Sequence, residues 1–128
     1  MIDMLIGTGV DLIEVERIAQ SIERFGSRFL ERIYTEREIA YCTPKRNSAE
    51  SFAARFAAKE AGAKALGTGI NLGVTWREIE VTRSPLGRPA LELSGRARQV
   101  AQNLGVRTTS LALTHTAAMA IAMVVMES

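Results

Sequence analysis

Apolar and polar residues alternate with different periods along the first third of the chain. Residues 4–13, MLIGTGVDLI, are mostly apolar with two glycines, which predicts a buried strand that carries one carboxylate, Asp11. In residues 14–24 the apolar side chains recur at helical spacing, and Gly26 is expected to end that helix. Residues 27–34 suit a short helix or a turn.

Two further helices are expected before the middle of the chain. Thr35 and Glu38 have the spacing of a capping box, so a helix is predicted to begin there and to end before Pro44. Residues 48–66 predict a long alanine-rich helix, and Gly67 stands where a C-terminal glycine cap belongs.

The second half of the chain is dominated by strand patterns. Apolar residues alternate at 79–81 and 90–93 on either side of the turn sequence SPLGRP, which predicts two strands and a loop. Ser94 is expected to cap a helix that ends near Leu104, with Gly105 as its stop, and two strands are predicted at 108–115 and 118–126. This order predicts an α+β fold in which an antiparallel sheet packs on the long central helix.

Length and composition suit one domain that spans residues 1–128. The single cysteine, Cys42, excludes an internal disulfide and a cysteine metal cluster. The first residues lack the basic region of a signal peptide, and the longest apolar run, 117–126, is shorter than the roughly 18 residues that a membrane span needs. We therefore expect a cytoplasmic protein with no membrane partner.

The formal net charge is only +2, which is less basic than a dedicated nucleic-acid binder, so no nucleic-acid partner is expected. Arginines nevertheless crowd the first half of the chain, where glutamates interleave with them. Two interpretations stay open from the pattern alone: a solvated helical surface with local ion pairs, or a surface that binds an acidic partner or RNA.

The long helix carries charges where a plain core helix would not. At about 100° per residue, Lys59 falls within the stripe of apolar residues, Glu60 lies at the edge of the stripe and Lys64 lies just beyond it. A buried charge is unfavourable unless a partner or ligand neutralises it. Alternatively, Lys59 extends to water, and Glu60 and Lys64 form an ion pair one turn apart.

Asp11 poses the same problem, because it lies inside an apolar strand. Two carboxylates with nearby lysines suit magnesium, which substrate phosphates can help to coordinate. Sequence spacing does not show whether Asp11 and Glu60 are neighbours, and each alone also suits a structural role. His115, the only histidine, fits a simple strand-edge residue, and a Cys42–His115 nucleophile pair would lack an orienting group.

Several segments together resemble the bacterial holo-acyl-carrier-protein synthases. The most specific are IGTGVDLIEVERI at 6–18 and FAARFAAKEAGAKALGTGI at 52–70. FGSRFLERIYTEREIAYC at 25–42, SPLGRPALEL at 84–93 and LTH at 113–115 agree with them. The resemblance covers nearly the whole chain in order.

The resemblance implies the 4′-phosphopantetheinyl transferase fold and a homotrimer with active sites between neighbouring subunits. It assigns Asp11 and Glu60 as magnesium ligands and Lys64 as a phosphate contact. All three are catalytic residues by this resemblance. The residues it places near coenzyme A are Arg55, Lys59, Lys64, Pro85, Gly87, Pro89 and His115. The residues it places against an acidic carrier protein are Arg17, Arg24 and Arg28.

The implied reaction transfers the 4′-phosphopantetheine group of coenzyme A to a serine of apo-acyl carrier protein. It depends on magnesium and releases adenosine 3′,5′-bisphosphate. Two rival hypotheses are a non-catalytic module that binds an acidic partner or RNA, and a structural domain that only forms trimers.

Overall fold

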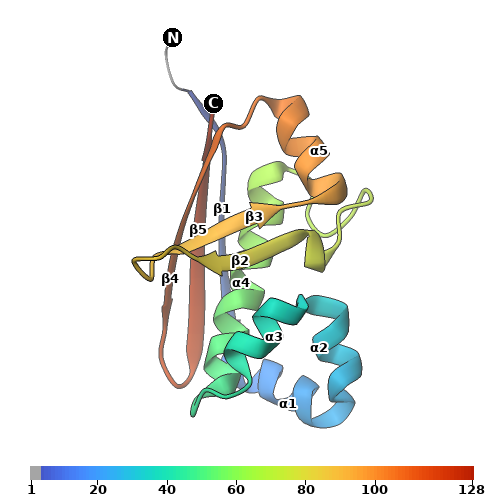
Figure 1. Ribbon diagram of the computed structural model, residues 1–128, viewed down its shortest axis with the longest axis vertical. Coiled ribbons are helices and arrows are strands. Elements are labelled where there is room, and N and C mark those ends of the chain that lie inside the picture. Colours follow the sequence, from blue (N-terminus) through green and yellow to red (C-terminus); the bar gives the residue numbers. More distant parts are fainter. Residues whose placement is uncertain (1–3) are drawn as a thin grey trace.

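A long helix, α4 (Ser48–Leu66), runs between a three-stranded sheet and a two-stranded hairpin (Figure 1). The computed structural model describes residues 4–128. The larger sheet is antiparallel in the order β1-β5-β4, and the hairpin pairs β2 with β3. The strands are β1 (Leu5–Glu14), β2 (Ile79–Arg83), β3 (Pro89–Leu93), β4 (Thr108–His115) and β5 (Met119–Glu127).

The remaining helices gather at the two ends of α4 (Figure 1). At one end lie α1 (Val15–Phe25), α2 (Ser27–Ile33) and α3 (Glu36–Cys42). At the other lies α5 (Gly95–Leu104), and a short 3-10 helix, η1 (Trp76–Glu78), leads into β2. No helix within residues 4–128 is long and apolar enough to cross a membrane.

These elements confirm the predicted α+β fold and most of its predicted boundaries. The capping box is present: the Thr35 hydroxyl oxygen accepts from the Glu38 backbone N–H, and the Glu38 carboxylate accepts from the Thr35 N–H. Gly67 adopts φ 81°, the left-handed conformation of a C-terminal cap. Ser94 occupies the N-cap position of α5, but the prediction that its side chain caps the helix is wrong, because the Glu78 carboxylate accepts from the Arg96 backbone N–H at 2.7 Å instead.

The prediction that α4 has a single apolar stripe is wrong. The helix is covered on almost every side, by the larger sheet, by the hairpin and by α1 and α3, and within it only Lys64 is exposed. Its many alanines make this possible, because small side chains allow neighbours to approach from several directions. A helix buried in this way shows little amphipathic pattern in its sequence.

Strand β1 lies unusually close to α4 through two glycines. A Cβ atom on Gly9 would overlap the carbonyl oxygen of Ala61, and one on Gly7 would overlap that of Ala65. Two strand residues advance about 6.6 Å and four helix residues about 6 Å, so the two contacts follow each other in register. The next residue on this face of β1 is Asp11.

We expect Gly9→Ala to destabilise the protein by about 3 kcal/mol or more, because a methyl group there meets rigid helix backbone and must push β1 from α4. The matched control is Thr8→Ala on the opposite, exposed face of β1. Urea denaturation of both variants measures the difference. A Gly9→Ala protein as stable as the control would contradict the close packing.

Candidate active site

Asp11 and Glu60 come together beside an open cavity. The register of β1 on α4 places them next to each other, and they line a cavity of about 240 Å³ that we call the Asp11 cavity. Arg17 stands at the same cavity, whose apolar wall includes Phe29 and Phe56. The sequence could not show that the two carboxylates are neighbours, and the fold makes them so.

Lys64 completes this group from one turn further along α4. Its Nζ lies 3.1 Å from Asp11 Oδ1 and donates a second hydrogen bond to the Val10 carbonyl oxygen, also at 3.1 Å. The alternative of a Glu60–Lys64 ion pair is therefore wrong, because the ammonium pairs with Asp11. The Lys64 side chain stays about half exposed (51%), so it remains accessible to a ligand.

The electrostatics of Glu60 favour an additional positive charge. Burial raises the pKa of Glu60 above its ordinary value, and the negative Asp11 beside it raises it further, while Lys64 has a weaker opposite effect. No third histidine, cysteine or carboxylate joins them in a metal-binding group within residues 4–128. Two carboxylates beside an open cavity fit Mg²⁺, which keeps several waters and takes phosphate oxygens as its other ligands.

Lys59, although next to Glu60 in sequence, belongs to the core. Its side chain is completely buried, and Nζ bonds the Glu38 carboxylate at 2.6 Å and the carbonyl oxygens of Trp76 and Ile79. All three ammonium hydrogens are therefore used. The prediction that Lys59 contacts a nucleotide is wrong, and so is the alternative that it extends to water.

A second cavity collects other predicted coenzyme A residues. Arg55, Pro89 and His115 line a cavity of about 170 Å³, the Arg55 cavity, together with Tyr41 and Arg83. Pro85 and Gly87 lie instead in the turn between β2 and β3, where the Gly87 N–H donates to the Ser84 carbonyl oxygen at 2.8 Å. The structure thus groups three of these predicted residues and leaves two on the neighbouring hairpin turn.

Cys42 and His115 do not form a nucleophile pair. His115 Nδ1 lies 2.9 Å from a carboxylate oxygen of Glu50. Cys42 is fully buried, with its Sγ 3.7 Å from the Arg55 guanidinium, and burial raises the pKa of its thiol to about 11. A buried thiol with so high a pKa is a poor nucleophile.

The two cavities lie on different sides of α4. Arg55 and Glu60 are five residues apart, which is about 140° around a helix, and Arg55 and Lys64 are nine apart, about 180°. A single copy of the chain therefore does not bring all the predicted site residues together. They divide into an acidic group at the Asp11 cavity and a basic group at the Arg55 cavity, which we call the acidic and basic half-sites.

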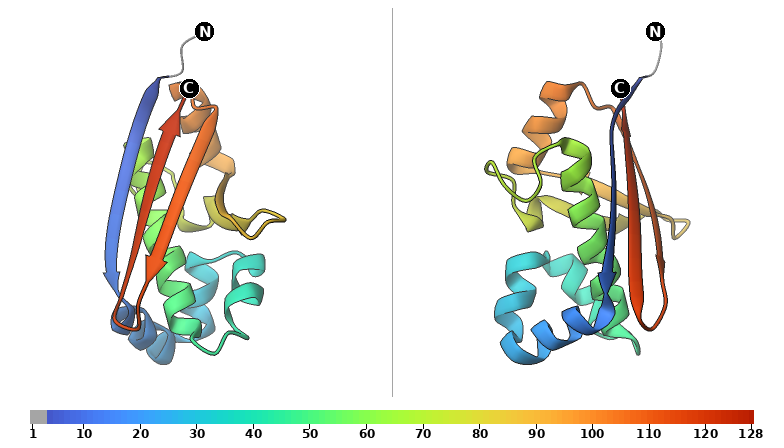
Figure 2. Two further views of the ribbon diagram at one scale, coloured as in Figure 1. Left: turned by 90° about the vertical axis from the view of Figure 1, so that its left-hand side faces the viewer. Right: turned by 180° about the vertical axis from the view of Figure 1, so that it is seen from behind.

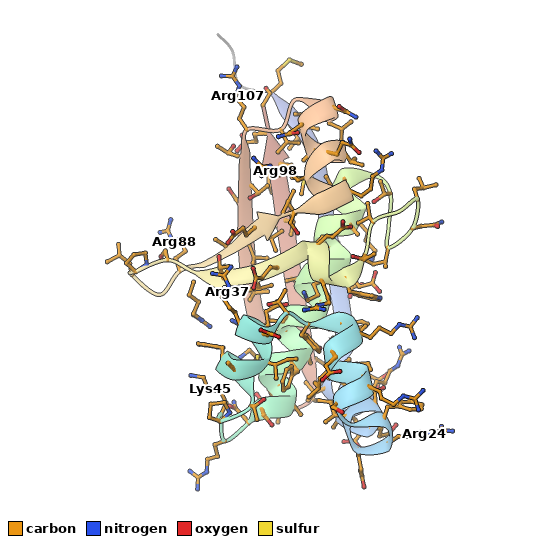
Figure 3. All side chains as sticks on the ribbon, turned by 45° about the vertical axis from the view of Figure 1, so that its right-hand side comes forward. Arg24, Arg37, Lys45, Arg88, Arg98 and Arg107 are labelled. Carbon is orange, nitrogen blue, oxygen red and sulfur yellow. The ribbon has the colours of Figure 1, made fainter. Side chains whose placement is uncertain are left out.

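The three arginines assigned to carrier binding lie on α1 and α2, two helices that line the Asp11 cavity. Arg17 lines the Asp11 cavity, and Arg28 lines an adjacent cavity of about 370 Å³ that shares Ser21 and Phe29 with it. The Arg24 guanidinium lies over the Phe25 ring, 5.2 Å from its centre. Figure 3 shows Arg24 on one side of the helical end and Lys45 on the other.

Sequence reasoning missed the partners of several site residues. Glu38 was identified only as a helix cap, although a lysine in a core helix calls for a buried carboxylate. Glu50 as the partner of His115, and Tyr41 and Arg83 beside Arg55, depend on contacts between elements distant in sequence. No local pattern signals those contacts.

Residues 7–122 match the family model of the 4′-phosphopantetheinyl transferase superfamily. The chain belongs to this superfamily. A holo-[acyl-carrier-protein] synthase of Koribacter versatilis (strain Ellin345) is 58% identical over 97% of this chain and 99% of the relative. A second, of Solibacter usitatus (strain Ellin6076), is 54% identical over 98% of this chain and 100% of the relative.

Solved structures of the superfamily agree in fold. The holo-[acyl-carrier-protein] synthase of Neisseria meningitidis superposes with a TM-score of 0.88 at 34% identity, covering 98% of this chain and 100% of that one. The Helicobacter pylori synthase, crystallised with coenzyme A, gives a TM-score of 0.82 at 34% identity, covering 93% of this chain and 98% of that one.

We expect Glu60→Gln to stabilise the metal-free protein at pH 7. Because the folded-state pKa of Glu60 is raised, its ionisation disfavours folding above the ordinary glutamate pKa. The gain should shrink as pH falls below that value, where Glu60 is protonated in folded and unfolded chains alike. Thermal denaturation in EDTA measures this, with the exposed Glu23→Gln as control. A destabilised Glu60→Gln protein at pH 7 would argue against the strained carboxylate pair.

Proposed function

We propose that this chain is a holo-[acyl-carrier-protein] synthase, which transfers the 4′-phosphopantetheine group of coenzyme A to a serine of apo-acyl carrier protein. The observation that carries the proposal is the meeting of Asp11, Glu60 and Lys64 beside an open cavity. The relative from Koribacter versatilis bears this name at 58% identity.

In the proposed reaction the serine oxygen attacks the phosphorus atom of coenzyme A that carries the pantetheine. A new P–O bond forms to serine, the bond to the bridging pyrophosphate oxygen breaks, and adenosine 3′,5′-bisphosphate leaves while the hydroxyl proton is released. Lys64 Nζ, half exposed beside Asp11, is placed to neutralise charge that develops on the phosphate oxygens. The chain acts mainly by positioning the two substrates.

Asp11 and Glu60 would hold a magnesium ion at the edge of the Asp11 cavity. When bound, such an ion neutralises pyrophosphate oxygens and stabilises the charge that shifts to the leaving group. The chain's own contribution is to hold the two carboxylates together in a partly buried place: burial first, and then repulsion from Asp11, raises the pKa of Glu60.

We propose that the nucleotide lies at Arg55, Pro89 and His115 of a neighbouring subunit in a homotrimer, with the β2–β3 turn that holds Pro85 and Gly87 close by. The half-sites on different sides of α4 support this arrangement. The outer face of the larger sheet is covered by no element of residues 4–128 (Figure 2). It exposes Val10 beside Met123 and Leu12 beside Ile121, an apolar surface suited to burial between subunits. An active monomer in sedimentation at assay concentration would contradict the trimer.

The proposal predicts that Asp11→Asn slows transfer about 100-fold or more at limiting magnesium, because one of two metal-holding carboxylates is lost. Excess magnesium should restore activity only in part. The assay incubates apo-acyl carrier protein, coenzyme A and magnesium, and detects the added group by mass spectrometry. Glu14→Gln, at the exposed end of the same strand, is the control. Full activity of Asp11→Asn at limiting magnesium would exclude this metal site.

Arg17, Arg24 and Arg28 are proposed to dock the acidic carrier protein next to the Asp11 cavity. Arg17→Glu should raise the KM for carrier protein and leave the KM for coenzyme A nearly unchanged, because rim charges chiefly speed association. The defect should shrink as salt rises. Arg98→Glu, on α5 at the far end of the molecule (Figure 3), makes the same charge change away from the site. Equal effects of Arg17→Glu on both KM values would point instead to a nucleotide contact.

A further inference from the structure

Three cations from different parts of the fold surround the ring of Tyr41. From its centre, the Arg55 guanidinium carbon lies at 4.3 Å, Lys45 Nζ at 4.4 Å and the Arg83 guanidinium carbon at 5.1 Å. Tyr41 belongs to α3, Arg55 to α4 and Arg83 to the end of β2, while Lys45 lies in the loop between α3 and α4. All three cationic side chains therefore lie against the same aromatic ring.

Among the residues described, the three cations of the cluster have no ion-pair partner of their own, because Glu80, the carboxylate at one of the adjoining cavities, pairs with Arg37. None of the ion pairs formed within residues 4–128 involves Lys45, Arg55 or Arg83. Arg55 is buried, with 4% of the residue exposed, and its Nε has no hydrogen-bond partner in the described part of the chain. Buried donors are nearly always satisfied, so this one calls for an acceptor.

The Tyr41 ring and two of the cations around it lie at cavities where an anion could bind and neutralise their charge. Tyr41, Arg55 and Arg83 line the Arg55 cavity and also a second cavity of about 180 Å³ next to it. The electron-rich face of an aromatic ring attracts cations and so offsets part of their mutual repulsion. A tyrosine ring can therefore hold these charges close together before the anion arrives, which reduces the ordering required on binding.

We propose that Tyr41 is a positioning residue of the basic half-site: its ring holds Lys45, Arg55 and Arg83 together as one site for a phosphate group of the nucleotide. Tyr41 acts through the three cations and need not touch the ligand. This inference rests on the proposed function, because that function requires a bound nucleotide. It goes beyond the proposed function by naming Tyr41 as the residue that positions the three cations.

The test compares Tyr41→Leu with Tyr41→Phe, which keeps the ring. The probe is adenosine 3′,5′-bisphosphate, titrated calorimetrically into the intact protein without carrier protein. Tyr41→Leu should weaken binding about tenfold and Tyr41→Phe less than about twofold, on the scale of contacts between cations and rings. In turnover, Tyr41→Leu should raise the KM for coenzyme A and leave kcat and the KM for carrier protein nearly unchanged.

A shape-preserving series separates the charge effect from packing. Replacing Tyr41 with phenylalanine and then with 3,4,5-trifluorophenylalanine withdraws electrons from the ring face but keeps its shape. Affinity for the bisphosphate should fall with fluorination while the circular dichroism spectrum, and so the fold, stays the same. Unchanged affinity across this series, or in a folded Tyr41→Leu protein, would overturn the inference.

Arg55→Met distinguishes this failure from failure of the proposed function. If Arg55→Met weakens bisphosphate binding and the Tyr41 variants do not, only the role of Tyr41 is overturned. If Arg55→Met also has no effect, the nucleotide does not occupy this half-site and both proposals about it fall.

Discussion

The close approach of β1 to α4 is the contact on which the rest of the structure depends. It exists because Gly7 and Gly9 present no side chain to the backbone carbonyls of Ala65 and Ala61. With the strand seated in this register, the next residue on the same face is Asp11, and Glu60 and Lys64 of the helix lie beside it. Two glycines that have no chemistry of their own thereby bring the reactive side chains together.

The same helix separates two kinds of charge. Glu60 lines the cavity beside β1 and Lys64 pairs with Asp11 next to it, while Arg55 faces α3 and the hairpin on the other side. Between them, Lys59 is neutralised internally by Glu38, which also accepts the backbone N–H of Val81 and so ties α3 to α4 and β2. This buried ion pair leaves the lysine unavailable to a ligand, but it fixes the helix against the elements that carry the basic half-site.

Sequence reasoning predicted the elements well where local signals were strong, as at the Thr35–Glu38 capping box and the Gly67 cap. It drew attention to Asp11 and Glu60 because a carboxylate in an apolar segment demands a partner, and the family resemblance then assigned them to a metal site. It misplaced Lys59, because the many glutamates in the first half of the chain gave no means of choosing Glu38 as its partner. It also could not separate Arg55 from Glu60 as members of different half-sites, since this depends on which elements cover each side of α4.

The central claim is that each active site combines the acidic half-site of one subunit with the basic half-site of its neighbour. Asp11→Asn and Arg55→Met variants, each nearly inactive alone, can be refolded together in equal amounts and assayed for transfer. If subunits mix at random, about one quarter of the sites regain both intact halves, and activity should recover to about that fraction of wild type. Mixing Asp11→Asn with Glu60→Gln should recover nothing, because both changes fall in the same half-site. No recovery in the first mixture, despite demonstrated subunit exchange, would contradict the account.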